Sequence, residues 1–263
     1  MDKVNLFPDK NFWNGKNVFI TGHSGFKGGW LSLWLSQLGA NVTGYSLEPN
    51  TDPSFYNACD IGSVTNSIFG NILDYKKLES SIINAKPEII IHMAAQALVL
   101  ESYKNPLDTY KTNIIGTLNI LEIIRNKSYV KAFINVTSDK CYENIEKQYS
   151  YKETDRMGGH DPYSSSKGCS ELVTSAYRLS FFNENSDKSS ITSIASARSG
   201  NVVGGGDWSA DRLIPDFFKA VSQKKAMHIR HPSATRPWQH VLEPIRGYLI
   251  LAELMFKNEG YSE

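Results

Sequence analysis

The sequence has few cysteines, no excess of either charge and no long apolar run. Cys59, Cys141 and Cys169 are odd in number and lack CxxC spacing, which excludes a disulfide framework and favours a reducing compartment such as the cytoplasm. Lysine and arginine total 28 against 27 for aspartate and glutamate, so no basic surface for nucleic acid or an anionic membrane is expected. The longest apolar stretch, residues 89–100, contains a histidine and a glutamine, so no membrane-spanning helix is expected.

Signals for export and for metal binding are also missing. Residues 1–8 lack the basic and then apolar pattern of a signal peptide. His160, His228, His231 and His240 lack metal-ligand spacing, so no metal site is expected and these histidines are interpreted as structural.

The composition is typical of a folded α/β protein. The 263 residues, 41% of them apolar, allow one large domain or two smaller ones. Short β-rich runs alternate with longer stretches of helical period, which predicts a doubly wound parallel sheet with helices on both faces. The expected strands are residues 18–20, 41–45, 67–70, 88–92, 132–137 and 191–197, and the expected helices are residues 28–38, 74–84, 106–125, 163–183, 211–223 and 243–257.

The pattern becomes irregular after the glycine cluster at residues 200–206. We therefore predict a dinucleotide-binding domain over residues 1–197 and a smaller substrate-binding lobe over residues 198–263. Residues 143–161 are charged and glycine-rich and lie between a strand and a helix that both carry polar motifs. This segment is predicted to be a long active-site loop.

A glycine-rich segment joins the first predicted strand to the first helix. Residues 21–28 read Thr-Gly-His-Ser-Gly-Phe-Lys-Gly, with glycines three apart. Glycine permits a tight turn and a close approach of backbone N–H groups to a pyrophosphate, which the following helix N-terminus stabilises. The segment therefore predicts a dinucleotide site at this turn.

Two features near this segment stay open. Lys27 is interpreted either as reaching a phosphate or the active site, or as a solvated lysine of the first helical turn. The end of the second strand, where an acid would bind the ribose of NAD and an arginine the 2′-phosphate of NADP, reads Tyr-Ser-Leu-Glu at residues 45–48. Glu48 is the acidic candidate, and the lack of a nearby arginine favours NAD.

A second motif has the pattern of acid–base chemistry. Tyr163 and Lys167 stand four residues apart at the start of a predicted helix, so they share one helix face. A neighbouring ammonium favours a phenolate, which would let Tyr163 take an alcohol proton. Ser138 follows a predicted strand at the carboxyl edge of the sheet and is expected to hydrogen-bond the reacting hydroxyl.

Together, the glycine segment, Ser138, Tyr163 and Lys167 resemble the extended type of the short-chain dehydrogenase/reductase superfamily. Residues 92–96 and 113–117 resemble two further motifs of that group, and residues 71–72 lie where its members often contact adenine. The resemblance implies a Rossmann-type fold and NAD as cofactor. The implied cofactor site consists of Gly22, Gly25, Phe26, Gly28, Asn71, Ile72, Ala94, Ala95, Gln96, Asn113, Tyr163 and Lys167.

The residues after Ser138 separate branches of this group. Asp139 and Lys140 are charged, as is typical of nucleotide-sugar dehydratases, whereas sugar epimerases are typically uncharged there. The branch that acts on CDP-glucose is similar to this sequence at residues 21–34, 138–143, 158–163, 198–208 and 236–241.

The resemblance implies conversion of CDP-glucose to CDP-4-keto-6-deoxy-glucose. Tyr163 would remove the sugar 4-hydroxyl proton with help from Ser138, while C4 passes its hydride to NAD. Lys140 is the implied base at C5 and Asp139 the implied acid at the departing 6-hydroxyl, after which the hydride returns to C6. There is no net redox change, so the cofactor stays bound through the cycle.

The resemblance also implies a binding site for the substrate. Asn201, Arg212 and Arg236 would contact its diphosphate, which matches the planar guanidinium group. A surface ion pair for Arg212 stays equally open. Arg198 is interpreted as a buried structural arginine in preference to a substrate contact. Trp208 and Trp238 are interpreted as core packing in preference to a border of the sugar site.

The size and assembly of the protein are further expectations. Related dehydratases continue beyond the point where this chain ends, so we expect an incomplete substrate lobe. Residues 106–125 and 163–183 resemble the helices at subunit interfaces in this group, which implies a homodimer or higher homo-oligomer. Two alternatives to a dehydratase remain: a nucleotide-sugar 4-epimerase and a non-catalytic NAD-binding fragment.

Overall fold

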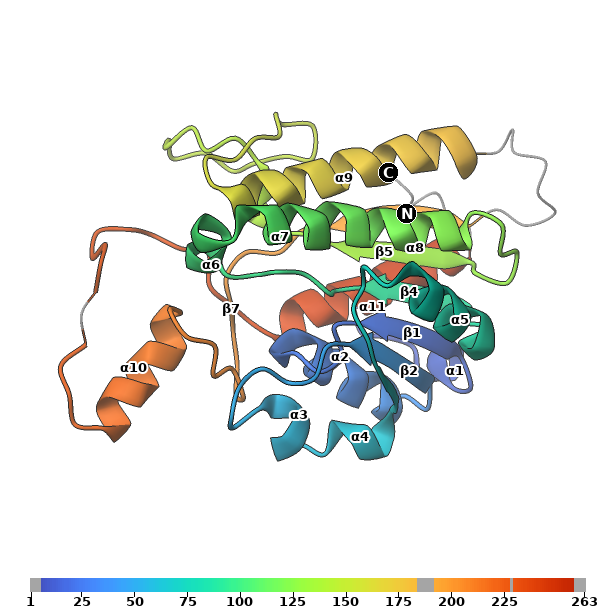
Figure 1. Cartoon of the computed structure of the whole chain (residues 1–263), viewed down its shortest axis with the longest axis horizontal. Helices are drawn as coiled ribbons and strands as arrows, with labels where there is room; N and C mark the ends of the chain where they lie inside the picture. The colour runs from blue at the N-terminus through green and yellow to red at the C-terminus, as the bar shows by residue number, and fades with distance from the viewer. Residues whose placement is uncertain (1–5, 184–191, 228, 258–263) are drawn as a thin grey trace.

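A computed structural model describes residues 6–183, 192–227 and 229–257. Six parallel strands form one sheet in the order β3-β2-β1-β4-β5-β6 (Figure 1). The strands are β1 (Asn17–Thr21), β2 (Asn41–Ser46), β3 (Asn66–Phe69), β4 (Ile89–His92), β5 (Ala132–Val136) and β6 (Ser193–Ala197). This confirms the predicted doubly wound α/β class, with the strand order reversing between β1 and β4.

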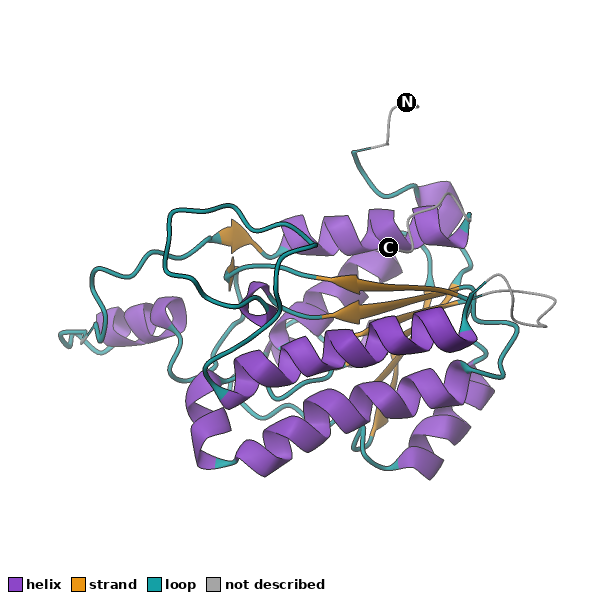
Figure 2. Cartoon of the chain, turned by 90° about the horizontal axis from the view of Figure 1, so that it is seen from above, coloured by secondary structure: helices purple, strands orange, loops and turns teal. Residues whose placement is uncertain are grey.

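Helices cover both faces of the sheet (Figures 1 and 2). Side chains alternate between the faces along each strand. Val18 and Ile20 of β1 therefore pack on one side, with α2 (Phe26–Gln37) and α11 (Leu242–Phe256). Phe19 packs on the other side. The helices on that side are α5 (Tyr75–Ala85), α8 (Gly116–Ile124) and α9 (Pro162–Phe181).

Several short helices were not expected from the sequence. They are α1 (Lys10–Trp13), α3 (Phe55–Ala58), α4 (Ile61–Val64) and α6 (Val99–Lys104). Each has only four to six residues, which is too short to show a helical period. Trp13 nevertheless anchors α1, because its Nε1 donates to Glu253 Oε1 of α11 at 2.6 Å.

The helix predicted over residues 106–125 is not uniform. It consists of α7 (Pro106–Tyr110), a π-helical turn η1 (Lys111–Ile115) and then α8. A π turn widens the helix locally and is frequent at functional sites. It contains Asn113, which is almost fully buried. The strand predicted over residues 191–197 is β6, but residue 191 lies outside the described residues.

The segment after β6 leaves the sheet. Strands β7 (Val202–Val203) and β8 (Gln239–His240) form a separate parallel pair, and α10 (Leu213–Ser222), which has no buried residue, extends away from the sheet layers (Figure 1). Core packing of the two tryptophans was wrong, because Trp208 and Trp238 are 41% and 40% exposed.

Helix α11 differs from the rest of the predicted lobe. Its residues Ile245 and Leu249 are fully buried in the same core as Leu31 and Leu35 of α2. By its packing, α11 therefore belongs with the sheet. Val241, just before α11, is fully buried in the same core, and Val202 packs against it.

The described helices include none with the length and apolar character that a membrane crossing requires. Within the described ranges, no group of three or more histidine, cysteine, aspartate or glutamate side chains is placed to hold a metal ion. His228 lies outside the described residues.

Candidate active site

The predicted site residues gather at the carboxyl edge of the sheet. The glycine segment follows β1, residues 93–96 follow β4, Ser138 follows β5 and Ser199 follows β6. In an open parallel sheet, ligands bind at this edge, next to the point where the strand order reverses.

At two positions of the glycine segment, the backbone geometry of the chain itself requires glycine. Gly22 has φ +81, and a Cβ there would lie 2.8 Å from the backbone nitrogen of Ala94. A Cβ on Gly28 would lie 2.0 Å from the carbonyl oxygen of Gly22. A side chain on Gly22 would therefore push against the segment after β4, and one on Gly28 would push apart the tight turn between β1 and α2.

The backbone geometry does not require glycine at position 25. Its φ is −79, and a Cβ there would meet no atom nearer than 3.5 Å. It is exposed, and α2 begins at Phe26 without a side-chain cap. The first N–H groups of α2 are therefore free to bind an anion. This open cradle fits the diphosphate of a dinucleotide.

Thr21 fixes the segment after β4 against the glycine segment. Its Oγ1 accepts the backbone N–H groups of Met93 and Ala94, both at 3.1 Å, and lies 2.6 Å from Nδ1 of His92. His92 is fully enclosed between Thr21 and Thr117, and burial lowers its pKa to about 3. The imidazole is therefore neutral, and it joins Thr21 to Thr117 by hydrogen bonds.

Asn113 of the π turn connects this segment to α9. Its Nδ2 donates to the Gln96 carbonyl at 3.0 Å and to Ser166 Oγ at 2.8 Å, and its Oδ1 accepts the Gln96 N–H at 2.9 Å. The structure thus brings the predicted cofactor residues Ala94, Ala95, Gln96 and Asn113 beside the glycine segment.

Asn71 and Ile72 follow β3 at the same edge. The Asn71 carbonyl accepts the Tyr45 hydroxyl, and the Ile72 carbonyl accepts Nδ2 of Asn119, both at 3.0 Å. The Ile72 side chain packs in the core, whereas the Asn71 side chain is exposed. Glu48 is also exposed, two residues beyond β2.

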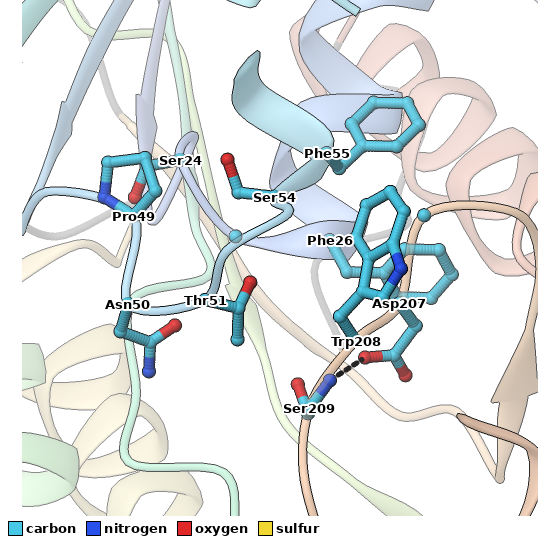
Figure 3. A pocket seen from close by; sticks show the side chains of 12 residues that line it. Ser24, Phe26, Pro49, Asn50, Thr51, Ser54, Phe55, Asp207, Trp208 and Ser209 are labelled. Atoms are coloured by element: carbon cyan, nitrogen blue, oxygen red, sulfur yellow. Dashed lines mark hydrogen bonds between the residues drawn. The ribbon is translucent and has the colours of Figure 1, made fainter. Parts of the chain in front are cut away.

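A pocket opens beside Ser24, Gly25 and Phe26 (Figure 3). The segment after β2 forms one side of it, and Asp207, Trp208 and Ser209 form another, with the Ser209 N–H donating to Asp207 at 3.1 Å. The sequence analysis missed Pro49, Asn50, Thr51, Ser54 and Phe55, which also line the pocket. A polar, proline-containing run directly after a sheet strand was the available signal.

The turn after β5 holds the predicted acid–base residues. The Ser138 hydroxyl donates to Asp139 Oδ1 at 3.0 Å and accepts the Lys140 N–H at 3.2 Å, so it caps the 3-10 turn η2 (Asp139–Cys141). The Asp139 N–H donates to the carbonyl of Ser199 at 3.2 Å. The turn is thereby fixed both by its own cap and by the segment after β6.

Tyr163 and Lys167 are buried on the first turns of α9, which Asp161 caps by accepting the Ser164 N–H at 2.9 Å. Lys167 Nζ donates to the carbonyl of Val136, at the end of β5, at 3.1 Å. Burial lowers the pKa of Lys167 to about 8.

The surroundings of Tyr163 act on its pKa in opposite directions. Burial raises the pKa of Tyr163 above its ordinary value, whereas a hydrogen bond with Ser138 and the charge of Arg212 act to lower it.

Lys27 points into the site, so the solvated interpretation was wrong. Its Nζ donates to Ser199 Oγ at 2.9 Å and to the Tyr248 hydroxyl of α11 at 3.4 Å. The side chain therefore leaves the glycine segment and reaches the strand edge beside Asp139.

The predicted substrate residues separate into two groups. Arg212 forms an ion pair with Asp207 at 3.1 Å and lies close enough to Tyr163 to lower its pKa. The buried Oδ1 of Asn201 lacks a hydrogen-bond partner among the described residues, as do the Tyr129 hydroxyl and the Oδ1 of Asn135; at the edge of the site, such an oxygen is suited to a ligand donor. Arg236 is exposed and donates to the Thr235 carbonyl at 2.6 Å; no described contact joins it to the catalytic side chains.

The structural interpretation of Arg198 is confirmed. Its Nε donates to buried Glu171 of α9 at 2.8 Å, and its Nη1 donates to the Tyr142 hydroxyl at 2.6 Å. The Tyr142 ring stacks on Tyr151 at a centroid distance of 4.8 Å. The predicted active-site loop is therefore anchored to α9 and to the end of β6.

The chain matches a known protein family and is similar to several of its members. The sequence profile of the family described as GDP-mannose 4,6 dehydratase matches residues 19–259. A CDP-glucose 4,6-dehydratase from Salmonella typhimurium is 51% identical over 252 residues, which are 96% of this chain and 70% of that protein. A dTDP-D-glucose 4,6-dehydratase from Dictyostelium discoideum is 29% identical over 80% of this chain and 49% of that protein.

Solved structures share the fold. An epimerase from Methanothermobacter thermautotrophicus has a TM-score of 0.80 at 23% identity and covers 97% of this chain and 72% of its own. A dTDP-glucose 4,6-dehydratase double mutant from Streptomyces venezuelae, solved with NAD bound, has a TM-score of 0.77 at 21% identity over 91% of this chain and 71% of its own.

Proposed function

Because this chain belongs to the GDP-mannose 4,6 dehydratase family, we propose that it is a nucleotide-sugar 4,6-dehydratase that acts on CDP-glucose. The observation that carries the proposal is the turn after β5, where Asp139 is hydrogen-bonded to Ser138 at 3.0 Å beside buried Tyr163. Oxidation at C4 needs Ser138 and Tyr163, whereas loss of water needs the additional acid. The identity of 51% to a CDP-glucose 4,6-dehydratase supports the choice of substrate.

NAD is the proposed cofactor. The open cradle at Gly25 would hold its diphosphate, Asn71 and the segment 94–96 would border it, and Lys167 would hold its nicotinamide ribose. When bound, it supplies an acceptor for the C4 hydride and gives that hydride back at C6.

The protein groups act at three atoms of the sugar. Tyr163 accepts the proton of the 4-hydroxyl, which Ser138 orients, and the resulting 4-ketone acidifies the C5 proton. Lys140 removes that C5 proton, and Asp139 protonates the departing 6-hydroxyl, so that water leaves across C5 and C6. Lys140 then returns a proton to C5 as the hydride returns to C6. Each acid–base step contributes about 10²–10⁴ in rate.

The proposed substrate contacts come from the segment after β6. The guanidinium of Arg212 is suited to a diphosphate, and the Oδ1 of Asn201, which lacks a partner among the described residues, is suited to a sugar hydroxyl or a cytosine amino group. Arg236 remains a proposed diphosphate contact that would require its exposed loop to close.

Mass spectrometry of the purified chain with NAD and CDP-, dTDP-, UDP- or GDP-linked glucose tests this function. The expected result is loss of one water from CDP-glucose. An unchanged mass together with inversion at C4 would instead identify a 4-epimerase. An unchanged sugar, with NAD still raising the melting temperature, would identify a cofactor-binding protein without turnover.

We propose a homodimer built on residues 106–125, which form α7, η1 and α8, and on α9. Exposed leucines occur on α7 and α9: Leu107 is 67% exposed, Leu172 60% and Leu179 65%. Contact with a second chain would bury such exposed apolar side chains. Light scattering should give twice the chain mass for the natural protein and the chain mass for Leu172→Glu. Phe218→Glu, at an equally exposed position on α10, should leave the dimer intact. A monomeric natural chain would contradict the proposal.

A further inference from the structure

One buried carboxylate lies beside both ends of the catalytic turn. The proposed catalytic residues 138–140 stand between Thr137 and Cys141. Glu171 of α9 is 3% exposed, and its Oε1 accepts the Thr137 hydroxyl at 2.5 Å. Burial, followed by the charge of Glu171, raises the pKa of the Cys141 thiol to about 12, so the same carboxylate lies next to the other end of the turn.

Arg198 extends this contact to the residue that follows the turn. Its Nε donates to both oxygens of Glu171, at 2.8 and 2.9 Å, and its Nη2 donates to Oε2. Its Nη1 donates to the Tyr142 hydroxyl at 2.6 Å, and its guanidinium carbon lies 4.6 Å from the centroid of the Tyr142 ring. The Asp139 N–H also donates to the carbonyl of Ser199, the residue after Arg198. The far end of the turn is therefore held through Arg198 to the same carboxylate.

Glu171 stands on the helix that carries Tyr163 and Lys167. It follows Lys167 by four residues and therefore lies on the same face of α9. The backbone of α9 fixes Tyr163 and Lys167 relative to each other, whereas residues 138–140 belong to a separate turn. Glu171 connects that turn to the helix, so its side chain sets the spacing between the two parts of the proposed catalytic set.

The Glu171 carboxylate is one half of a buried ion pair. The side chains of Glu171 and Arg198 are only 2% and 17% exposed. Removing one partner of such a pair is strongly destabilising, because the other charge stays buried without compensation. A change at Glu171 alone would therefore cost folded protein as well as positioning, whereas a change at Thr137 keeps the ion pair.

We propose that Glu171 is a positioning residue for the loss of water, which holds Asp139 and Lys140 in place relative to Tyr163. This inference rests on the proposed function. Oxidation at C4 uses only Ser138 from the turn, and Ser138 is the catalytic residue nearest to β5, whose end is fixed by its pairing with β6. Loss of water uses Asp139 and Lys140, which lie further from the strand. A displaced turn therefore slows loss of water more than oxidation.

The test is the ratio of two products from CDP-glucose, measured by mass spectrometry after quenching with borodeuteride: the 4-keto sugar that keeps its 6-oxygen, and the dehydrated sugar. Thr137→Val keeps the shape of the side chain but lacks the hydroxyl that donates to Glu171. It should lower kcat for water loss by about 10- to 100-fold and raise the share of the 4-keto sugar, with little change in KM. Glu171→Gln combined with Arg198→Met removes both charges of the pair and should shift the ratio in the same direction.

Thr174→Val is the matched control. Thr174 is also a buried threonine, and it lies on the same helix as Glu171. Its hydroxyl donates to the Ser170 carbonyl at 2.8 Å and accepts Nδ2 of Asn135 at 2.9 Å. Its loss should lower the melting temperature but leave the product ratio unchanged. Thr137→Ser keeps a hydroxyl and should retain most of the natural kcat.

A merely structural role for Glu171 would lower kcat only through the fraction of folded protein, so the product ratio would stay constant. An unchanged ratio in Thr137→Val, or an equal change in Thr174→Val, would overturn the inference, while water loss by the natural chain would leave the proposed function standing. If the natural chain removes no water from any of the sugars, the proposed function falls and this inference falls with it.

Discussion

Tyr163→Phe is expected to lower kcat for water loss from CDP-glucose by about 10²–10⁴-fold. The phenol is buried and hydrogen-bonded to Ser138, so phenylalanine fills the same space but cannot accept the 4-hydroxyl proton. Binding of NAD, measured by fluorescence titration, should change little. Tyr177→Phe is the matched control, because it removes a phenol that donates to Glu122 at 3.1 Å near the other end of the same helix.

The pH profile of the natural chain tests the roles of Tyr163 and Lys167 together. The proposed active state needs a deprotonated Tyr163 and a protonated Lys167. Burial lowers the pKa of Lys167 from its ordinary value to about 8, so its ammonium is lost as the pH rises through 8. Because the pKa of Tyr163 is raised, kcat/KM should rise with pH up to about 8 and level off above it, where each gain in Tyr163 phenolate is offset by loss of the Lys167 ammonium. A rate that keeps rising well beyond it would exclude an essential Lys167 ammonium.

The parts of the fold that were predictable are those with local signals. Residues 89–91 form an uninterrupted run of isoleucine that is fully buried in β4, as expected for a central parallel strand. Gly22 has a positive φ, and at Gly28 the turn itself excludes a side chain. Such constraints act over a few residues and are therefore visible in the sequence.

The features that were missed depend on contacts between distant residues. The direction of Lys27 is set by Ser199 and Tyr248, which lie 172 and 221 residues away along the chain. The raised pKa of Tyr163 depends on burial, whereas the YxxxK spacing indicates only that a lysine shares its helix face. The π turn around Asn113 covers only residues 111–115, too few for a separate period to show in the sequence.

Asp139→Asn is expected to reduce water loss by about 10²–10⁴-fold while leaving oxidation at C4 intact. The asparagine can still accept the hydrogen bond from Ser138 and keep the backbone bond to Ser199, but it has no carboxyl proton for the departing 6-hydroxyl. The 4-keto sugar should then accumulate with its 6-oxygen. Quenching with borodeuteride and mass spectrometry would detect deuterium at C4.

Asp155→Asn is the matched control, because this carboxylate accepts the Lys152 N–H at 2.7 Å in the exposed loop and should not affect turnover. Normal dehydration by Asp139→Asn would assign the acid role to another group.

Exchange of the C5 proton in deuterium oxide then distinguishes the roles of Asp139 and Lys140, the two charged residues on η2. If Lys140 is the C5 base, Asp139→Asn should still exchange the C5 proton of the trapped ketone, whereas Lys140→Met should not. Equal exchange in both variants would remove Lys140 from the mechanism and leave Asp139 as the residue that distinguishes dehydration from epimerisation.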